Sequence, residues 1–280
     1  MVKDIDFNPL SVSTGNRMSI FDLKKRKGGI PIVCVSLYDF YMARLCDPYV
    51  DMILVGDSLG MVVCGDQDTL DVTVSQIISH ARGVVRAANS AIVVVDMPFG
   101  SFESSPETAF ASASRIMNDT HCDAVKLECT SDMVPQVEML VSRGIPVVAH
   151  IGMLPQSAGG ERGSFTPIVD IESYGVIYDT AIAVQNAGAC AIVVEAVAEE
   201  FAINIVNACS IPIIGIGASP KCDGQILVAH DLLGLTEAPM RFVKKYADLA
   251  NDVRNAIQEY ASDVVTGRFP SSENTYKVKY

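Results

Sequence analysis

The stretch Ile92-Val-Val-Val-Asp96 places four β-branched apolar residues before a carboxylate. Runs that are apolar throughout, rather than alternating, are typical of strands buried on both faces of a parallel sheet. Similar short runs recur along the chain at spacings suited to β-α units: Ile32–Ser36, Met52–Val55, Ala124–Glu128, Val147–Ile151, Ala191–Glu195, Ile213–Ile216 and, less clearly, Ile226–Val228. Together these runs predict an α/β protein with a parallel sheet.

Segments with helical periodicity lie between the runs. Residues 72–88 carry apolar side chains at spacings of three and four, and they open with the capping-box pattern Thr73-Val-Ser-Gln76. Another helix is predicted from Ser105-Pro106-Glu107, which supplies a cap residue, a first-turn proline and an early acid. Eight strands alternating with helices favour a (β/α)8 TIM barrel, and a doubly wound open sheet remains the alternative.

The chain has 280 residues, a length that α/β barrels often reach as one unit. It carries no internal repeat and no low-complexity linker. We therefore predict one barrel domain over residues 1–280, with a short N-terminal extension and a weakly ordered polar tail at Asp263–Tyr280. Ser157–Ile171, rich in glycine, serine and charge, is predicted as the loop after the fifth strand.

The composition narrows the choice of partners. Lys and Arg total 21 and Asp and Glu total 33, so the formal net charge is -12 at pH 7. A field of this sign repels phosphate backbones and anionic membrane surfaces, so we expect neither nucleic acid nor a membrane as a partner. A small anionic substrate stays compatible with it, because one metal ion inverts the local sign of a site.

The cysteines and the start of the chain point to a cytoplasmic protein. None of the eight cysteines forms a CxxC pair, and most lie in apolar runs, so we expect reduced core thiols rather than zinc ligands or disulfides. No apolar run approaches the ~18–20 residues that cross a bilayer, and Met1–Ser19 contains no secretory signal.

Functional side chains follow five successive runs, where the carboxyl ends of barrel strands face the active site. They are Asp57 and Ser58, then Asp96, then Lys126 and Glu128, then His150, and then Glu195. A single acid at a strand end is commonly a helix cap or a solvated loop residue. Because five strands deliver such residues toward one rim, the pattern predicts a catalytic site.

The three acids Asp57, Asp96 and Glu128 offer only oxygen ligands, which suits Mg²⁺ with open positions for water and substrate. A 2-keto acid bound to the ion through its carboxylate and keto oxygen would have a polarised carbonyl. Its adjacent C–H would become more acidic, and the enolate would be stabilised by Lewis-acid catalysis.

The remaining polar residues fit the same chemistry. Lys126 would place a fixed positive charge beside the reacting oxygen, and Glu195, outside the metal cluster, would act as the base. His150 either donates a hydrogen bond to a substrate oxygen or is a hydrogen-bonded rim histidine without a chemical role. The sequence does not decide between these two roles.

Five stretches together resemble one known family. They are Val55-Gly-Asp-Ser-Leu-Gly-Met61, Asp96-Met-Pro-Phe-Gly100, Val125-Lys-Leu-Glu128, His150-Ile-Gly-Met-Leu-Pro-Gln156 and Asp223-Gly-Gln-Ile-Leu-Val228. In order and spacing they resemble the ketopantoate hydroxymethyltransferase family over roughly residues 18–265. The resemblance implies a (β/α)8 barrel of the phosphoenolpyruvate mutase and isocitrate lyase superfamily, usually assembled as a homodecamer.

The resemblance also implies roles for residues at matching positions. The family's magnesium ligands correspond to Asp57, Asp96 and Glu128. Its contacts to the keto acid correspond to Asp57, Ser58, Asp96 and Lys126. A further substrate-side residue corresponds to His150, and the proton acceptor corresponds to Glu195. The implied reaction removes the C3 proton of 3-methyl-2-oxobutanoate. The enolate then attacks the one-carbon unit of 5,10-methylenetetrahydrofolate, giving 2-dehydropantoate and tetrahydrofolate.

Two stretches depart from the family pattern. Ser36-Leu-Tyr-Asp39 replaces the usual Thr-Ala-Tyr-Asp, and Ser157–Ile171 lacks the usual Tyr-Lys-Val-Gln-Gly sequence. The altered loop keeps open a Mg²⁺-dependent aldolase or C–C lyase that acts on a related 2-keto acid. A barrel that binds a keto acid without turnover is a further alternative, which the complete set of acidic and basic residues disfavours.

Overall fold

The computed structural model describes residues 17–157, 166–237 and 240–278. They fall into two compact units, Met1–Val228 and Ala229–Tyr280. The predicted N-terminal extension lies outside the described residues, and the single-domain organisation stays a prediction.

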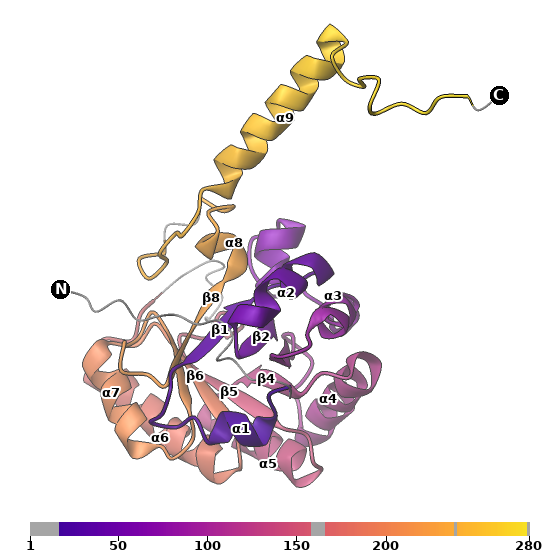
Figure 1. Cartoon of the computed structure of the whole chain (residues 1–280). Coiled ribbons are helices and arrows are strands. Elements are labelled where there is room, and N and C mark those ends of the chain that lie inside the picture. Colours follow the sequence, from indigo (N-terminus) through magenta and orange to yellow (C-terminus); the bar gives the residue numbers. More distant parts are fainter. Residues whose placement is uncertain (1–16, 158–165, 238–239, 279–280) are drawn as a thin grey trace. The chain divides into compact units, whose positions relative to one another are not determined.

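Eight parallel strands of the first unit close into a barrel, in which β8 pairs back with β1 (Figure 1). The strands are β1 (Ile32–Ser36), β2 (Met52–Val55), β3 (Ile92–Asp96), β4 (Ala124–Glu128), β5 (Val147–Gly152), β6 (Ala191–Glu195), β7 (Ile213–Ile216) and β8 (Gly224–Val228). The closure confirms the predicted TIM barrel and excludes an open sheet. Only β5 and β8 differ in extent from the predicted runs.

One short helix precedes β1, further helices follow β1 to β6 on the outside of the barrel, and β7 leads directly to β8 (Figure 1). They are α1 (Ile20–Lys24), α2 (Phe40–Cys46), α3 (Val74–Ala87), α4 (Pro106–Thr120), α5 (Val134–Ser142), α6 (Ile171–Asn186) and α7 (Glu199–Ala208), with short turns η2 (Asp47–Tyr49), η3 (Gly60–Cys64) and η4 (Ser131–Met133). Both predicted caps are present. Thr73 and Gln76 form the reciprocal capping box of α3, and the Ser105 hydroxyl accepts the Thr108 N–H at 3.2 Å at the start of α4.

Alternate residues of the strands form one buried apolar cluster in the barrel interior. Its members include Ile32, Cys34, Met52, Leu54, Ile92, Val94, Ala124, Val148, Ala191, Val193, Ile214 and Ile226. Leu23 of α1 belongs to the same cluster, and Met18 and Ile20 pack against it. The segment around α1 therefore covers one end of the interior.

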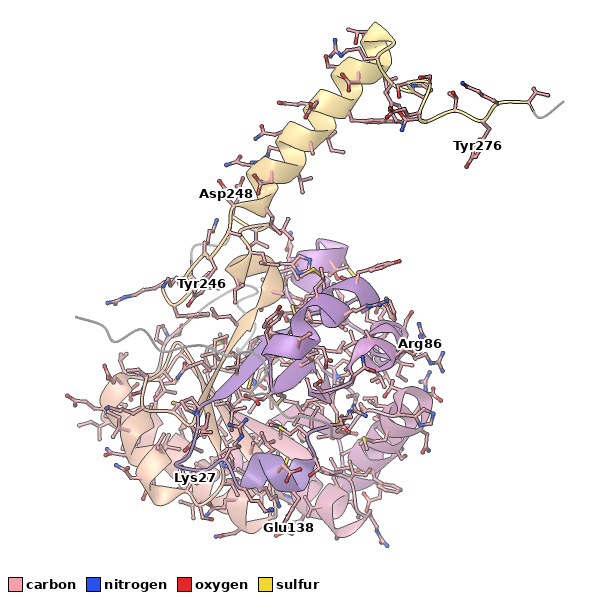
Figure 2. All side chains as sticks on the ribbon, viewed as in Figure 1. Lys27, Arg86, Glu138, Tyr246, Asp248 and Tyr276 are labelled. Atoms are coloured by element: carbon pink, nitrogen blue, oxygen red, sulfur yellow. The ribbon has the colours of Figure 1, made fainter. Side chains whose placement is uncertain are left out.

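Buried carboxylates hold that segment to the amino ends of the strands. Arg26 Nη2 lies 2.6 Å from Asp51 Oδ1, just before β2, and Lys27 Nζ (Figure 2) lies 2.9 Å from Asp223 Oδ2, just before β8. Asp223 Oδ2 also accepts the Ile213 N–H at 2.8 Å. Ion pairs thus hold this end of the barrel closed, and the opposite end is left for a site.

None of the eight cysteines forms a disulfide, and six of them are buried: Cys34, Cys122, Cys129, Cys190, Cys209 and Cys222. Burial raises the pKa of the Cys129 and Cys190 thiols to about 12, so both stay protonated at neutral pH. Cys46 is half-buried and Cys64 is exposed. The prediction of core thiols is confirmed for six of the eight.

The second unit contains α8 (Ala229–Leu232) and α9 (Leu249–Thr266), which begins after Asp248 (Figure 2). Gly267, at φ 70°, ends α9 by donating its N–H to the carbonyl of Asp263. The first residues of the predicted tail are therefore helical. Every helix within residues 17–157, 166–237 and 240–278 is too short or too polar to span a membrane.

Barrel closure depends on Gly224, which faces Ile32 in the β8–β1 ladder. A Cβ at this position would lie 2.6 Å from the Ile32 carbonyl oxygen and 2.8 Å from Ile214 Cδ1. We predict that Gly224→Ala lowers the free energy of unfolding by about 1–3 kcal/mol, because backbone on the neighbouring strand must shift. Urea unfolding followed by circular dichroism measures this loss.

Gly175→Ala is the matched control. Gly175 lies inside α6 with open space around its Cβ position, so alanine there is expected to stabilise the helix by up to about 1 kcal/mol. If Gly224→Ala is no less stable than Gly175→Ala, the predicted clash of the new Cβ with Ile32 and Ile214 would be contradicted.

Candidate active site

All seven predicted site residues lie at the carboxyl ends of β2 to β6. Asp57 and Ser58 follow β2, Asp96 ends β3, Lys126 and Glu128 lie in β4, His150 lies in β5 and Glu195 ends β6. Adjacent strands pair Asp96 with Lys126 and Glu128 with His150. Glu195 pairs with Gly152, two residues beyond His150.

The alternation of each strand directs these side chains inward. Ile92 and Val94 belong to the interior cluster, so Asp96 continues their row at the mouth of the barrel. In the next three strands, too, the site residues continue a row that begins with an interior apolar residue. Lys126 and Glu128 follow Ala124, His150 follows Val148, and Glu195 follows Val193 at spacings of two. The inward row of each of these strands thus changes from apolar to polar side chains toward its carboxyl end.

A buried ion pair lies at the centre of the site. Lys126 Nζ is 2.5 Å from Asp96 Oδ1, and Asp96 Oδ2 accepts the Asp57 N–H at 3.1 Å. Burial raises the pKa of Asp96 to about 6, an effect that the Lys126 charge opposes and the Asp57 charge increases. Burial lowers the pKa of Lys126, but the negative charges of Asp96 and Asp57 raise it by more. The pKa of Lys126 is therefore raised overall, and its ammonium group stays charged.

Glu128 lies beside this pair without a cation of its own. Its Oε1 accepts the Gln156 N–H at 2.9 Å and its Oε2 accepts the Ser157 hydroxyl at 3.1 Å. Burial, followed by the Asp57 charge, raises its pKa to about 8. Gln156 also donates its side-chain amide to Asp57 Oδ2 at 2.7 Å, so one residue connects the two acids.

The donor set fits a hard divalent cation in charge and atom type. Asp57, Asp96 and Glu128 are all buried, and in the fully ionised form that metal binding requires Lys126 neutralises only one of their three charges. A divalent ion would balance the remaining two, and carboxylate oxygens are the ligands that Mg²⁺ takes. Without an ion, the raised pKa of Glu128 leaves that carboxyl mostly protonated at pH 7. Among the residues that the structure describes, no three His, Cys, Asp or Glu side chains are already arranged as a metal site.

His150 and Glu195 form a second pair at the rim. His150 Nε2 lies 3.2 Å from Glu195 Oε2, but neither ring nitrogen has a hydrogen bond of good geometry among the described residues. Burial, and then the Lys126 charge, lower the pKa of His150 below its usual value, so the ring is neutral at neutral pH. The Glu195 side chain is 15% exposed against 2% for Asp96, which leaves Glu195 more open to a ligand.

Sequence analysis missed Tyr38 as a residue of the site. Its hydroxyl lies 2.8 Å from Ser58 Oγ and accepts from Ser36 Oγ at 3.4 Å. Glycine at position 56 makes room for this group, since a Cβ there would lie 2.9 Å from Ser58 Oγ and 3.0 Å from Ser36 Oγ. The three hydroxyl groups extend the site from β2 to β1.

Gln156 was the second omission. Both Tyr38 and Gln156 lie in stretches that the sequence analysis quoted, but neither carries a charge at neutral pH. Their place in the site comes from contacts with residues distant in sequence, Ser58 for Tyr38 and Asp57 for Gln156.

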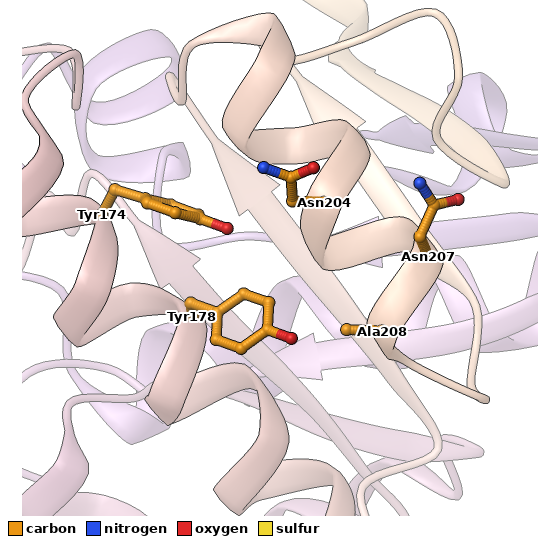
Figure 3. Close-up of a pocket in the computed structure, with 5 residues that line it drawn as sticks. All are labelled: Tyr174, Tyr178, Asn204, Asn207 and Ala208. Atoms are coloured by element: carbon orange, nitrogen blue, oxygen red, sulfur yellow. The ribbon is translucent and has the colours of Figure 1, made fainter.

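A separate open cavity of about 380 Å³ lies between α6 and α7 (Figure 3). It is lined by Tyr174 and Tyr178 of α6 and by Asn204, Asn207 and Ala208 of α7. It contains none of the predicted site residues, and the ionisable cluster at the barrel mouth remains the candidate active site.

Comparisons with known proteins identify the family of the chain. The family model described as ketopantoate hydroxymethyltransferase matches residues 17–272. A protein of Bartonella henselae named 3-methyl-2-oxobutanoate hydroxymethyltransferase is 46% identical over 263 residues, covering 94% of this chain and 96% of the relative. A protein of Maricaulis maris with the same name is 44% identical over 272 residues, covering 96% of each.

Solved structures support the fold. Phosphoenolpyruvate phosphomutase from Streptomyces platensis subsp. rosaceus aligns with a TM-score of 0.61 at 12% identity, over 93% of this chain and 92% of its own. The 2,3-dimethylmalate lyase, described as a member of the PEP mutase/isocitrate lyase superfamily, aligns with a TM-score of 0.57 at 15% identity, over 91% and 90%. The family model and the close relatives span nearly the whole chain, and the chain therefore belongs to the ketopantoate hydroxymethyltransferase family.

Proposed function

We propose that this chain transfers a hydroxymethyl group from 5,10-methylenetetrahydrofolate to 3-methyl-2-oxobutanoate, giving 2-dehydropantoate and tetrahydrofolate. The observation that carries the proposal is the set of acids around Lys126 at one barrel rim, in a chain of this family. The Lys126–Asp96 pair, Asp57, Glu128 and Glu195 all face the barrel mouth, where a small keto acid would bind.

Asp57, Asp96 and Glu128 would hold a Mg²⁺ ion, whose charge offsets their mutual repulsion. When bound, the ion supplies Lewis-acid polarisation of the keto oxygen, which makes the C3 proton of the substrate more acidic. The protein contributes a dry site for it, since the three acids are each less than a tenth exposed.

Lys126 and Ser58 would bind the keto acid. The Lys126 ammonium is fixed by Asp96 at 2.5 Å, and a fixed positive charge stabilises an oxyanion without reorganisation during the reaction. The Ser58 hydroxyl is held by Tyr38 at 2.8 Å, which orients it for a substrate oxygen.

Glu195 would take the C3 proton. Its carboxylate lies beside the neutral His150 ring and is partly exposed, so it can reach a ligand at the rim. The C3 carbanion then attacks the methylene carbon of the folate. Both bonds from that carbon to the folate nitrogens break, and water supplies the hydroxyl oxygen of the product.

The assembly and location also belong to this proposal. Family resemblance supports a homodecamer of this chain acting in the cytoplasm, with the keto acid and folate as its small-molecule partners. The subunit number is measured by sedimentation of the purified chain, and a monomer or dimer at micromolar concentration would contradict ten subunits.

The proposal predicts hydrogen–deuterium exchange at C3 of 3-methyl-2-oxobutanoate. Exchange followed by NMR is expected with Mg²⁺ and is expected to vanish with a chelator, because the proton is acidified only next to the ion. Adding 5,10-methylenetetrahydrofolate is expected to give 2-dehydropantoate.

Other outcomes of the same measurement separate the alternatives. Metal-dependent exchange without product in the presence of the folate would favour an aldolase or C–C lyase. Absence of exchange under every condition would favour a barrel that binds a keto acid without turnover. The divergent stretch 157–171, which motivates the lyase alternative, lies mostly outside the described residues.

For the base, we predict that Glu195→Gln slows C3 exchange by about 10²–10⁴-fold, the usual contribution of a general base. Glutamine keeps the size of the side chain, so calorimetric binding of Mg²⁺ and keto acid should persist. Glu199→Gln, an exposed change on α7, is the control and should exchange at the wild-type rate. An unchanged rate in the Glu195 variant would reject Glu195 as the base.

For the metal, we predict that Asp57→Asn weakens Mg²⁺ binding by about tenfold or more, equivalent to about 1.4 kcal/mol, because one anionic ligand is lost. Isothermal titration of the purified chain measures the affinity. Asp119→Asn removes an exposed acid paired with Arg82 and Arg115 at the end of α4, so it controls for net charge. Equal Mg²⁺ affinity in the two variants would argue against Asp57 as a ligand.

A further inference from the structure

Gln156 contacts three separate parts of the barrel rim through one buried residue. Its side-chain Nε2 donates to Asp57 Oδ2 at 2.7 Å and to the Met97 carbonyl at 3.1 Å. Its backbone N–H donates to Glu128 Oε1 at 2.9 Å. Gln156 is only 5% exposed, so these bonds lie away from bulk solvent. It thereby links the ends of β2, β3 and β4.

The link joins two groups that repel one another. Asp57 and Glu128 are both buried acids, and like charges in a low-dielectric site repel strongly. The ammonium of Lys126 bonds to Asp96 and to neither of these two acids. Among the described residues, Gln156 donates to both acids, so it links them without adding charge.

The pattern of donors and acceptors indicates that Gln156 orients the acids and does not take the place of an ion. Both hydrogens of its side-chain amide are used on protein acceptors, one of them the fixed backbone of Met97. No described residue bonds to Asp57 Oδ1, so the other face of that carboxylate stays open to a ligand.

The Gln156 Oε1 atom supplies a second, independent observation. It is buried and has no hydrogen-bond donor among the described residues. A buried acceptor without a hydrogen-bond donor lowers the stability of the fold, unless a ligand brings a donor to it. Because Oε1 belongs to the amide that holds Asp57, it is available to water that enters the site with a hydrated cation.

We propose that Gln156 is a positioning residue for a divalent cation, which holds Asp57 and Glu128 at the separation and orientation that the ion needs. This inference rests on the proposed function, since it takes those two acids as ligands. Hydrogen-bond partners of metal ligands typically contribute 10–100-fold to metal affinity.

Binding of Mn²⁺ to the full chain, followed by electron paramagnetic resonance, tests the proposal without a measurement of activity. Gln156→Leu keeps most of the side-chain volume and removes the side-chain donor to Asp57 and Met97, while the backbone N–H that bonds to Glu128 remains. We expect it to bind Mn²⁺ about 10–100-fold more weakly than the wild type. Thermal unfolding without metal checks that the variant is folded.

Gln136→Leu is the matched control. Gln136 is 4% exposed and donates to the backbone carbonyls of Phe102 and Glu103, with no bond to the acids. It therefore loses a buried amide of the same kind, and its Mn²⁺ affinity should stay at the wild-type value. If Gln156→Leu does not fold, Gln156→Asn replaces it, because the shorter amide cannot reach Asp57 and Met97 together.

Each other outcome overturns the inference in a distinct way. Wild-type affinity in the Gln156 variant means that the residue does not position the ligands. Tighter binding means that its amide competes with the ion. If the wild type does not bind Mn²⁺, the metal site itself is wrong, and with it the proposed function. If the wild type binds Mn²⁺ and the Gln156 variant binds it equally well, only the role of Gln156 is wrong.

Discussion

The eight strands of this barrel all run in one direction, and every second side chain of each strand points to the interior. These two constraints place the last inward residues of neighbouring strands around a single rim. Ile92 and Val94 pack in the core, and Asp96, the next residue of their row, belongs to the site. The hydrogen-bond ladder that stabilises the barrel therefore also sets the spacing of its functional groups. The amino end is closed separately by α1 and by the ion pairs of Arg26 and Lys27, which follow it.

The site brings together more negative charge than its own residues balance. Lys126 compensates Asp96, while Asp57 and Glu128 are held by neutral donors from Gln156 and Ser157. Burial of charge without a partner is unfavourable, and the raised pKa of Glu128 has this cause. The proposed cation site would explain an arrangement that stability alone would not favour, because a bound ion would supply the missing positive charge.

The sequence was sufficient to predict the strands, because continuous apolar runs have few other uses in a chain of this length. The polar residues at their ends, among them Asp96, Lys126 and His150, were expected at one rim of the barrel and lie there, while their roles stay predictions. Tyr38 and Gln156 were not predicted, because their importance comes from contacts across the chain: Gln156 reaches Asp57, 99 residues away. The last residues of helix α9 were predicted as part of a weakly ordered tail, because their composition is polar.

The distribution of thiols offers a route to spectroscopy. Cys64 is exposed at the end of η3, a few residues after the acid and serine that follow β2, whereas six other cysteines are buried. A maleimide dye at neutral pH will react first with Cys64 and the half-buried Cys46, because buried thiols such as Cys129 and Cys190 remain protonated. Replacing Cys46 by serine leaves Cys64 as the one accessible attachment point for a dye near the carboxyl end of β2.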